Sequence, residues 1–255
     1  MDTQRTRAKD SEETLARPHE LRSIGRAYYI RNSGIESCMS YWLVQHDIEA
    51  YWDRPDAIGS PKTRALRDRN FRQIRKGDKL LYYAKQKKAL GLFQVSSEHW
   101  FELRNWSKRR TGVHMAYEIK PVLAAISEID LADFGITTTR GRTVIRLTGE
   151  QYRKIAEHII GMKDPENHEG TVALFAKLHK ACGFPKLVKV GEAYPDILAI
   201  DERGREIRIE LEFESASFER EHAGQAEKCD LVVCWRDTWG RAATKPVLEL
   251  AGILY

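Results

Sequence analysis

The sequence predicts a mixed α+β and α/β protein with two domains: a compact β-barrel with small helices, then an α/β core around a mixed sheet. Three observations predict this fold class. Short apolar segments separated by polar breakers fill the chain before residue 161, a polar stretch with a proline covers residues 161–168, and a strictly alternating strand follows a tight turn at residues 201–204. At 255 residues and 42% hydrophobic content, the chain can bury one large core or two small ones.

The first 34 residues are charged and carry few hydrophobic side chains, which predicts a mostly disordered tail. Residues 35–44 are rich in aromatic and aliphatic side chains and predict a first strand. We expect residues 45–63 to be a polar connection, because two prolines and a glycine interrupt them. Leu66, Phe71 and Ile74 are spaced to line one face of a short helix that stops near Gly77.

Apolar runs at residues 79–83, 89–95, 117–122 and 143–147 predict four further strands. Thr148 and Gln151 form a capping-box pattern, and apolar side chains then recur at helical spacing up to Gly161. Residues 161–168 are the expected linker between domains covering residues 35–160 and 169–255. The second domain opens with a helix, expected over residues 171–182.

Residues 191–235 predict a strand, a hairpin turn, a second strand, a short helix and a third strand. Gly204 supplies the positive φ of the turn. In the second strand, Glu210 and Glu212 share one face, and like charges in a row disfavour folding. We expect Asp196 to lie beside Glu210 across the hairpin. Such converging carboxylates form an oxygen site for Mg²⁺ or Mn²⁺, which orients a water against a phosphodiester.

The pair Pro195-Asp196 followed by Glu210-Leu211-Glu212 resembles the PD-(D/E)xK motif of restriction-endonuclease-like nucleases, with Glu212 where the family usually has Lys. The resemblance implies a metal-dependent endodeoxyribonuclease in which Asp196 and Glu210 hold the metal and Glu212 joins the catalytic set. It also implies a catalytic Glu near the start of the domain's first helix, which matches Glu169. Further candidates for metal, phosphate or water contact are Lys186, Lys189, Glu192 and His222; a surface position is the alternative for His222.

The net charge is +5, and its distribution is uneven. Residues 64–88 and 104–110 combine dense Lys and Arg with Tyr and Trp, while acidic residues gather in the last third. Such stretches suit phosphate contact and base stacking. An ordinary solvated helix and loop is the equally weighted alternative.

Several segments of the first domain resemble the PUA-like EVE domain over residues 35–160. The most specific is Lys76-Gly77-Asp78-Lys79-Leu80-Leu81-Tyr82-Tyr83. The resemblance implies a reader that holds a modified base in an aromatic pocket, where stacking returns ~1–3 kcal/mol per base. The candidate base-binding residues are Ser40, Trp42, Trp52, Tyr83 and Trp106, and burial in the core is the alternative for each aromatic one.

Together these features predict a modification-dependent DNA endonuclease of the type IV restriction kind, with DNA carrying a modified base as its partner. One active site cuts one strand, so a double-strand break needs two protomers or two successive nicks. A homodimer is therefore a possible partner state. The alternatives are a non-catalytic nucleic-acid-binding protein with a degenerate nuclease fold, and a DNA-repair nuclease that reads damaged bases. No apolar run reaches ~20 residues and no signal peptide is evident, so we expect a soluble, cytoplasmic protein without membrane contact. The four cysteines show no metal-binding spacing.

Overall fold

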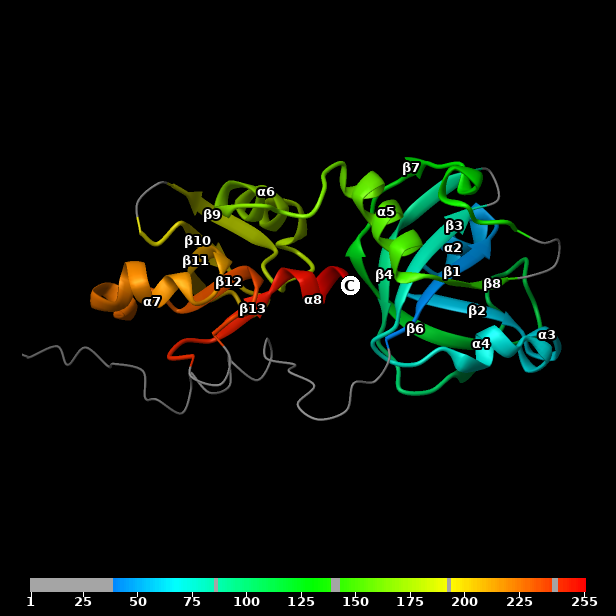
Figure 1. The fold of residues 1–255 in the computed structure, drawn as a ribbon. Helices are drawn as coiled ribbons and strands as arrows, with labels where there is room; N and C mark the ends of the chain where they lie inside the picture. The colour runs from blue at the N-terminus through cyan, green and yellow to red at the C-terminus, as the bar shows by residue number, and fades with distance from the viewer. Residues whose placement is uncertain (1–38, 85–86, 139–142, 192–193, 240–242) are drawn as a thin grey trace, which may run out of the picture.

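The computed structural model describes residues 39–84, 87–138, 143–191, 194–239 and 243–255. It contains two β-sheets that follow one another along the chain (Figure 1), which confirms the mixed α and β class. The predicted disordered tail at residues 1–34 and the candidate Glu192 lie outside the described residues. None of the described helices is long and apolar enough to cross a membrane.

The first sheet has eight strands and curls into a half-barrel (Figure 1). Its main path runs β2-β6-β4-β3-β1-β8, with β5 added to β6 and β7 to β4. The β1–β3 pair is parallel and the other pairs are antiparallel. The strands are β1 (Tyr41–His46), β2 (Ala57–Pro61), β3 (Lys79–Ala84), β4 (Lys88–Val95), β5 (Phe101–Arg104), β6 (Val113–Leu123), β7 (Ser127–Glu128) and β8 (Val144–Leu147). The four strands predicted after residue 78 are confirmed as β3, β4, β6 and β8.

The prediction of a polar connection over residues 45–63 is wrong, because this segment contains α2 (Ile48–Asp53) and β2. The apolar pattern of β2 is weak because its buried positions include Ala57, Gly59 and Ser60. These small residues permit a close approach: a Cβ at Gly59 would lie 2.4 Å from the ring of Trp106. Hydrophobicity alone could not reveal a strand that is buried through small side chains.

The single helix predicted after residue 64 is two short helices, α3 (Lys62–Arg67) and α4 (Arg69–Gln73). Asp68 separates them, since its carboxylate accepts hydrogen bonds from the backbone N–H groups of Asn70 and Phe71 and so caps α4. Phe71 is buried as predicted, whereas Leu66 is exposed.

The helix predicted after Thr148 is confirmed as α5 (Gly149–Ile160), including both bonds of the capping box between Thr148 and Gln151. A 3₁₀ helix, η1 (Leu131–Phe134), precedes it. The buried face of α5 includes Tyr152 and Ile155, whose side chains pack against the half-barrel.

The second sheet has five strands in the order β13-β12-β11-β10-β9, antiparallel from β9 to β11 and parallel from β11 to β13. This confirms the predicted mixed sheet. Its strands are β9 (Lys186–Val190), β10 (Ile197–Ile200), β11 (Glu206–Glu214), β12 (Leu231–Arg236) and β13 (Val247–Glu249). The hairpin turn lies where expected, with Gly204 at φ 77°. The helices of this half are α6 (His168–Leu178), α7 (Ser217–His222), the 3₁₀ helix η2 (Ala223–Lys228) and α8 (Leu250–Leu254).

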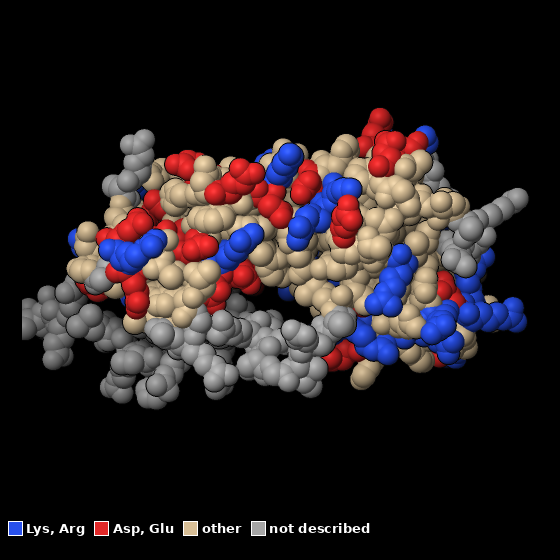
Figure 2. Space-filling view, viewed as in Figure 1, with Lys and Arg blue, Asp and Glu red and all other residues tan. Residues whose placement is uncertain are grey.

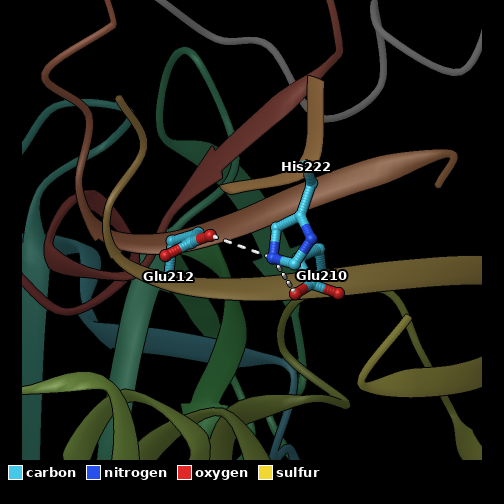
Figure 3. Close-up of side chains that lie close together, drawn as sticks. All are labelled: Glu210, Glu212 and His222. Atoms are coloured by element: carbon cyan, nitrogen blue, oxygen red, sulfur yellow. Dashed lines mark ion pairs between the residues drawn. The ribbon is translucent and has the colours of Figure 1, made fainter. Parts of the chain in front are cut away.

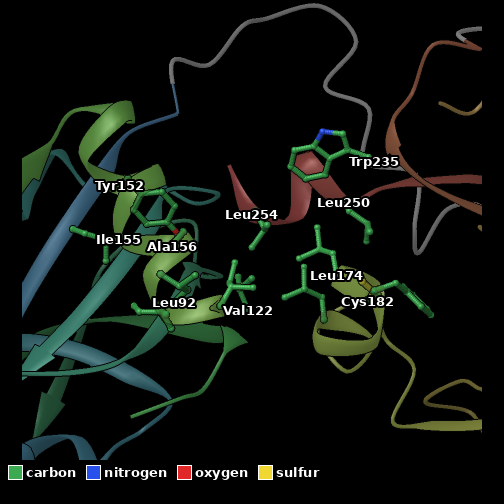
Figure 4. Close-up of a cluster of buried hydrophobic side chains, with 14 of the residues drawn as sticks. Leu92, Val122, Tyr152, Ile155, Ala156, Leu174, Cys182, Trp235, Leu250 and Leu254 are labelled. Carbon is green, nitrogen blue, oxygen red and sulfur yellow. The ribbon is translucent and has the colours of Figure 1, made fainter. Parts of the chain in front are cut away.

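One hydrophobic core joins the two sheets (Figure 4). Leu92 and Val122 of the half-barrel belong to the same buried cluster as Leu174 of α6 and Leu254 of α8. The predicted linker therefore runs beside a packed interface, where Asp164 accepts a 2.6 Å hydrogen bond from the hydroxyl of Tyr255.

A buried lysine fixes the end of the chain to the half-barrel. Lys79 of β3 is fully buried and donates hydrogen bonds to the carbonyl oxygens of Gly252 (3.1 Å) and Ile253 (2.6 Å) in α8. Burial, with a contribution from Lys120, lowers the pKa of Lys79 to about 7. The two halves thus share a hydrophobic core and a polar contact inside it.

Candidate functional site

Two carboxylates of β11 lie buried on one face of the second sheet. The two-residue period turns Leu211 toward the hydrophobic core and Glu210 and Glu212 to the opposite face, where they are 4% and 5% exposed. Asp196, just before β10, is beside them as predicted. Its backbone N–H donates to Oε2 of Glu210 (3.1 Å), and its own Oδ2 accepts from the N–H of Leu211 (3.0 Å).

His222 at the end of α7 completes this group (Figure 3). Its Nε2 lies 3.0 Å from Oε1 of Glu210 and 3.9 Å from Oε1 of Glu212. The ring stacks on Tyr194 at 4.5 Å between centroids, and the hydroxyl of Tyr194 donates to the carbonyl oxygen of Gln225. The imidazole is therefore held in place, with 19% of its side chain exposed. We call Asp196, Glu210, Glu212 and His222 the acid–histidine cluster.

Electrostatics in the cluster disfavour charged carboxylates. Burial, followed by the charge of Asp196, raises the pKa of Glu210 to about 7. Burial, followed by the charge of Glu221, raises the pKa of Glu212 to about 8. A cation among these groups would relieve both effects.

The spacing and chemistry of the donor set are compatible with a metal ion. One ligand atom each from Glu210, Glu212 and His222 lies within 4.8 Å of the others. Two carboxylate oxygens and one imidazole nitrogen suit Mn²⁺, and they suit Mg²⁺ less well because Mg²⁺ prefers oxygen ligands. The side chains present therefore fit a divalent cation.

The other candidates of the second half lie around this cluster. Glu169 is exposed in the first turn of α6, whereas its neighbour His168 places Nε2 3.4 Å from Oδ2 of Asp196. Lys186 and Lys189 are exposed on the edge strand β9. The structure thus brings an imidazole, instead of the expected carboxylate, from the start of α6 to Asp196.

A cavity of about 300 Å³ opens in the first half. Trp106 forms an aromatic wall together with His46, whose ring lies nearly parallel at 6.0 Å between centroids. The indole N–H of Trp106 donates to the carbonyl oxygen of Ala50, which fixes the ring. The lining residues are Gln45, His46, Asp47, Gly59, Ser60, Pro61, Arg64, Trp106, Arg110, His114 and Thr143.

The polar part of the cavity contains a hydroxyl without a hydrogen-bond partner. Ser60 is 2% exposed, and its Oγ has no partner among the described residues. An unpaired buried hydroxyl costs ~1–3 kcal/mol. Arg110 is paired with Asp47 at 3.0 Å, and Arg64 is exposed at the rim. The cavity is therefore lined by a buried aromatic ring, by a residue with a buried, unpaired hydroxyl, and by two arginines.

Of the five residues predicted to bind a base, only Trp106 lines this cavity. Trp42 is a core residue whose indole N–H donates to Oδ2 of Asp78 (2.7 Å), and Tyr83 belongs to the core shared by the two sheets. Ser40 accepts a hydrogen bond from Arg146 at the start of β1, and Trp52 is 59% exposed on α2. The structure does not bring these four residues to the cavity.

No protein-family model matches the chain, and no curated protein matches it. The chain is similar to several solved structures. Protein Atu2648 from Agrobacterium tumefaciens is 16% identical with a TM-score of 0.35, over 49% of this chain and 96% of that one. Rpa0253 from Rhodopseudomonas palustris is 14% identical with a TM-score of 0.36, over 51% and 99%.

A third similar structure is the YTH domain of the Zygosaccharomyces rouxii MRB1 protein, in complex with N6-methyladenosine RNA. It is 12% identical with a TM-score of 0.37, over 53% of this chain and 94% of that one. With TM-scores below 0.5, these similarities leave the assignment of function to the chain's own side chains.

Proposed function

We propose that the chain is a metal-dependent endodeoxyribonuclease directed to DNA that carries a modified base. The observation that carries this proposal is the buried pair Glu210 and Glu212 facing His222, with Asp196 hydrogen-bonded behind them. Within the described ranges, no Lys or Arg forms an ion pair with these three carboxylates. In its charged form such a cluster destabilises the fold unless a cation neutralises it.

Glu210, Glu212 and His222 would hold the metal, and we favour Mn²⁺ over Mg²⁺ because of the imidazole. When bound, the ion supplies Lewis-acid polarisation of the scissile phosphodiester. Asp196 orients Glu210 through its backbone N–H. Oε1 of Glu212 faces His222, which leaves Oε2 of Glu212 to accept a proton from the attacking water. Glu212 would thus activate the water from the position where the family that this motif resembles usually has Lys.

The cavity supports a second activity in the same chain, the binding of a single base taken out of the DNA stack. At about 300 Å³ the cavity is at the small end of ligand pockets, as a single base requires. Stacking on Trp106 would return ~1–3 kcal/mol of the few kcal/mol that unstacking costs. Ser60 would hydrogen-bond the polar edge of the base, and Arg64 would bind the adjoining phosphate.

Two alternatives use the same residues. A non-catalytic binding protein would keep the cavity and lack hydrolysis, and a repair nuclease would accept a damaged base instead of a modified one. Cleavage in the presence of a divalent cation separates the first from the proposal, and the choice of DNA that is cleaved separates the second.

The test is incubation of the full chain with MnCl₂ or MgCl₂ and a panel of unmodified, base-modified and damaged duplexes. We expect cleavage of modified DNA, stronger with Mn²⁺. Glu210→Gln is expected to lose Mn²⁺ binding in calorimetry and about 100-fold or more of the cleavage rate, with DNA affinity unchanged. Glu206→Gln is the control, since Glu206 is exposed on the same strand.

Each other outcome contradicts part of the proposal. Mn²⁺ binding without cleavage of any duplex would favour the non-catalytic alternative. Equal cleavage of modified and unmodified duplexes would support the nuclease activity and contradict selectivity for a modified base. Cleavage confined to damaged DNA would favour the repair nuclease.

A further inference from the structure

Two short helices at the edge of the half-barrel present a row of arginines to solvent. Figure 2 shows Lys and Arg side chains gathered over α3 and α4, on the same side as the label of these helices in Figure 1. We call Arg64, Arg67, Arg69 and Arg72 the α3–α4 arginine face. All four are exposed.

The fold does not neutralise this face. Across the part of the chain that the structure describes, no ion pair or side-chain hydrogen bond is formed by Arg64, Arg67, Arg69 or Arg72. The acid between them, Asp68, uses its carboxylate to cap α4. On either side the cations are paired: Lys62 with Glu102, and Lys76 with Glu98. Four positive charges therefore lie close together with Asp68 as the acid between them, and none of the four forms a salt bridge among the described residues.

The arginine face is continuous with the cavity. Arg64 belongs to both, because it is the first of the four arginines and also lines the cavity that contains Trp106 and Ser60. An anion bound along α3 and α4 thus leads directly to a site with an aromatic wall. This continuity separates the face from a scattered set of surface charges.

From this arrangement we infer that the α3–α4 arginine face binds the phosphodiester backbone that flanks the base held in the cavity. The inference rests on the proposed function and adds the surface along which the DNA lies. Guanidinium groups match phosphate oxygens in a bidentate geometry, and such contacts fix the register of the nucleic acid without reading its sequence. An acidic protein segment or an anionic membrane would satisfy the charge, but neither supplies a planar base for Trp106.

The test compares two triple variants of the full chain in DNA-binding titrations between 50 and 200 mM salt. Arg67→Gln, Arg69→Gln and Arg72→Gln are combined, and Arg64 is kept because it lines the cavity. Each lost phosphate contact reduces the slope of log affinity against log salt by ~0.9, so we expect a slope flatter by about 2 to 3 and at least about tenfold weaker binding at low salt. The control combines Lys177→Gln, Lys180→Gln and Arg203→Gln, three exposed cations of the second half.

The outcomes separate this inference from the proposed function. A triple arginine variant with the affinity and salt slope of the control would overturn the inference. So would a loss of binding to phosphatidylserine vesicles or to a polyglutamate peptide with DNA binding retained. Cleavage by the wild type is measured separately on the same duplexes, and the inference is judged on binding and salt slope alone. A wild-type chain that never cleaves, together with the expected loss of salt slope, would contradict the nuclease and support the arginine face.

Discussion

The acid–histidine cluster and the cavity are opposite in charge and in construction. The cluster buries carboxylates whose only ion-pair partners among the described residues are histidines. The cavity adjoins the α3–α4 arginine face, whose four arginines form no ion pair within the described ranges. One β-hairpin and one short helix build the cluster. The cavity is lined by residues from β1, β2, α3 and β6, and from the segments after β1, between β5 and β6, and before β8.

The comparison indicates that the two regions suit ligands of opposite charge. Each region is electrostatically incomplete by itself, and each is completed by the ligand proposed for it, a divalent cation in one case and a phosphate backbone in the other. The shared core and the Lys79 contact with α8 hold the two regions in a fixed relation. Variants that alter one region without the other therefore test the comparison.

The largest expected effect is at Glu212, which distinguishes this cluster from the family it resembles. Glu212→Ala is expected to lower the rate of metal-dependent cleavage by about 100-fold or more, because it removes both a proposed metal ligand and the proposed proton acceptor. Glu212→Lys restores the commoner motif but places a cation where two carboxylates and an imidazole converge, so we expect a similar loss.

The rate is measured with Mn²⁺ on a modified duplex. Glu214→Ala is the control, since Glu214 follows on the same strand and is not part of the cluster. Wild-type cleavage by Glu212→Ala would show that Glu212 has no part in the reaction.

An intermediate effect is expected at Trp106, with Trp52 as a matched control. Trp106→Ala removes the stacking face of the cavity and is expected to weaken binding of modified DNA by ~1–3 kcal/mol, roughly five- to hundredfold. Trp52→Ala, on α2 and outside the cavity, is expected to leave binding unchanged. Because Trp106 is itself buried, Ser60→Ala serves as a milder cavity variant and is expected to weaken binding in the same direction. Titrations of modified and unmodified duplexes test whether Trp106 contacts the base. Equal losses of affinity for both duplexes would mean that Trp106 has only a structural role.

The sequence predicted the acid pair well because local rules determine it. Turn residues 201–204 set the register of the hairpin, and the two-residue period of β11 then places Glu210 beside Asp196. His222 is different, since its position depends on α7 folding over the sheet and on the ring of Tyr194 beneath it. No local pattern encodes such a contact.

The cavity and the interface between the sheets were not predictable for the same reason. Gly59 and Ser60 lie in a segment that has the composition of a loop. They line the cavity only because Trp106, which is distant in sequence, packs against Gly59. Lys79 lies on a correctly predicted strand, yet its charge is buried by α8 from the other end of the chain. Residues that contact only distant segments leave no signal in sequence periodicity.

The smallest expected effect concerns stability and sharpens the contrast in charge. The pKa values of Glu210 and Glu212, about 7 and 8, lie above the ordinary value of 4.5. The folded state therefore binds more protons than the unfolded chain between about pH 4.5 and 8, and the free energy of unfolding falls as pH rises through this window. In EDTA, the double variant Glu210→Gln and Glu212→Gln is expected to exceed the wild type by on the order of 1–3 kcal/mol at pH 8.5 and by almost nothing near pH 5.

Lys79 provides the control of opposite sign in the same urea-denaturation series. Its folded-state pKa of about 7 lies below the ordinary 10.5, so the folded state binds fewer protons than the unfolded chain between these values. The cost of burying its charge is fully present below pH 7 and declines toward pH 10.5, which makes the free energy of unfolding rise with pH. Relative to wild type, Lys79→Met should therefore lose stability as pH rises, whereas the double glutamine variant should gain it. Parallel pH profiles for the two variants would contradict this assignment, and added Mn²⁺ should stabilise the wild type and Lys79→Met but not the double variant.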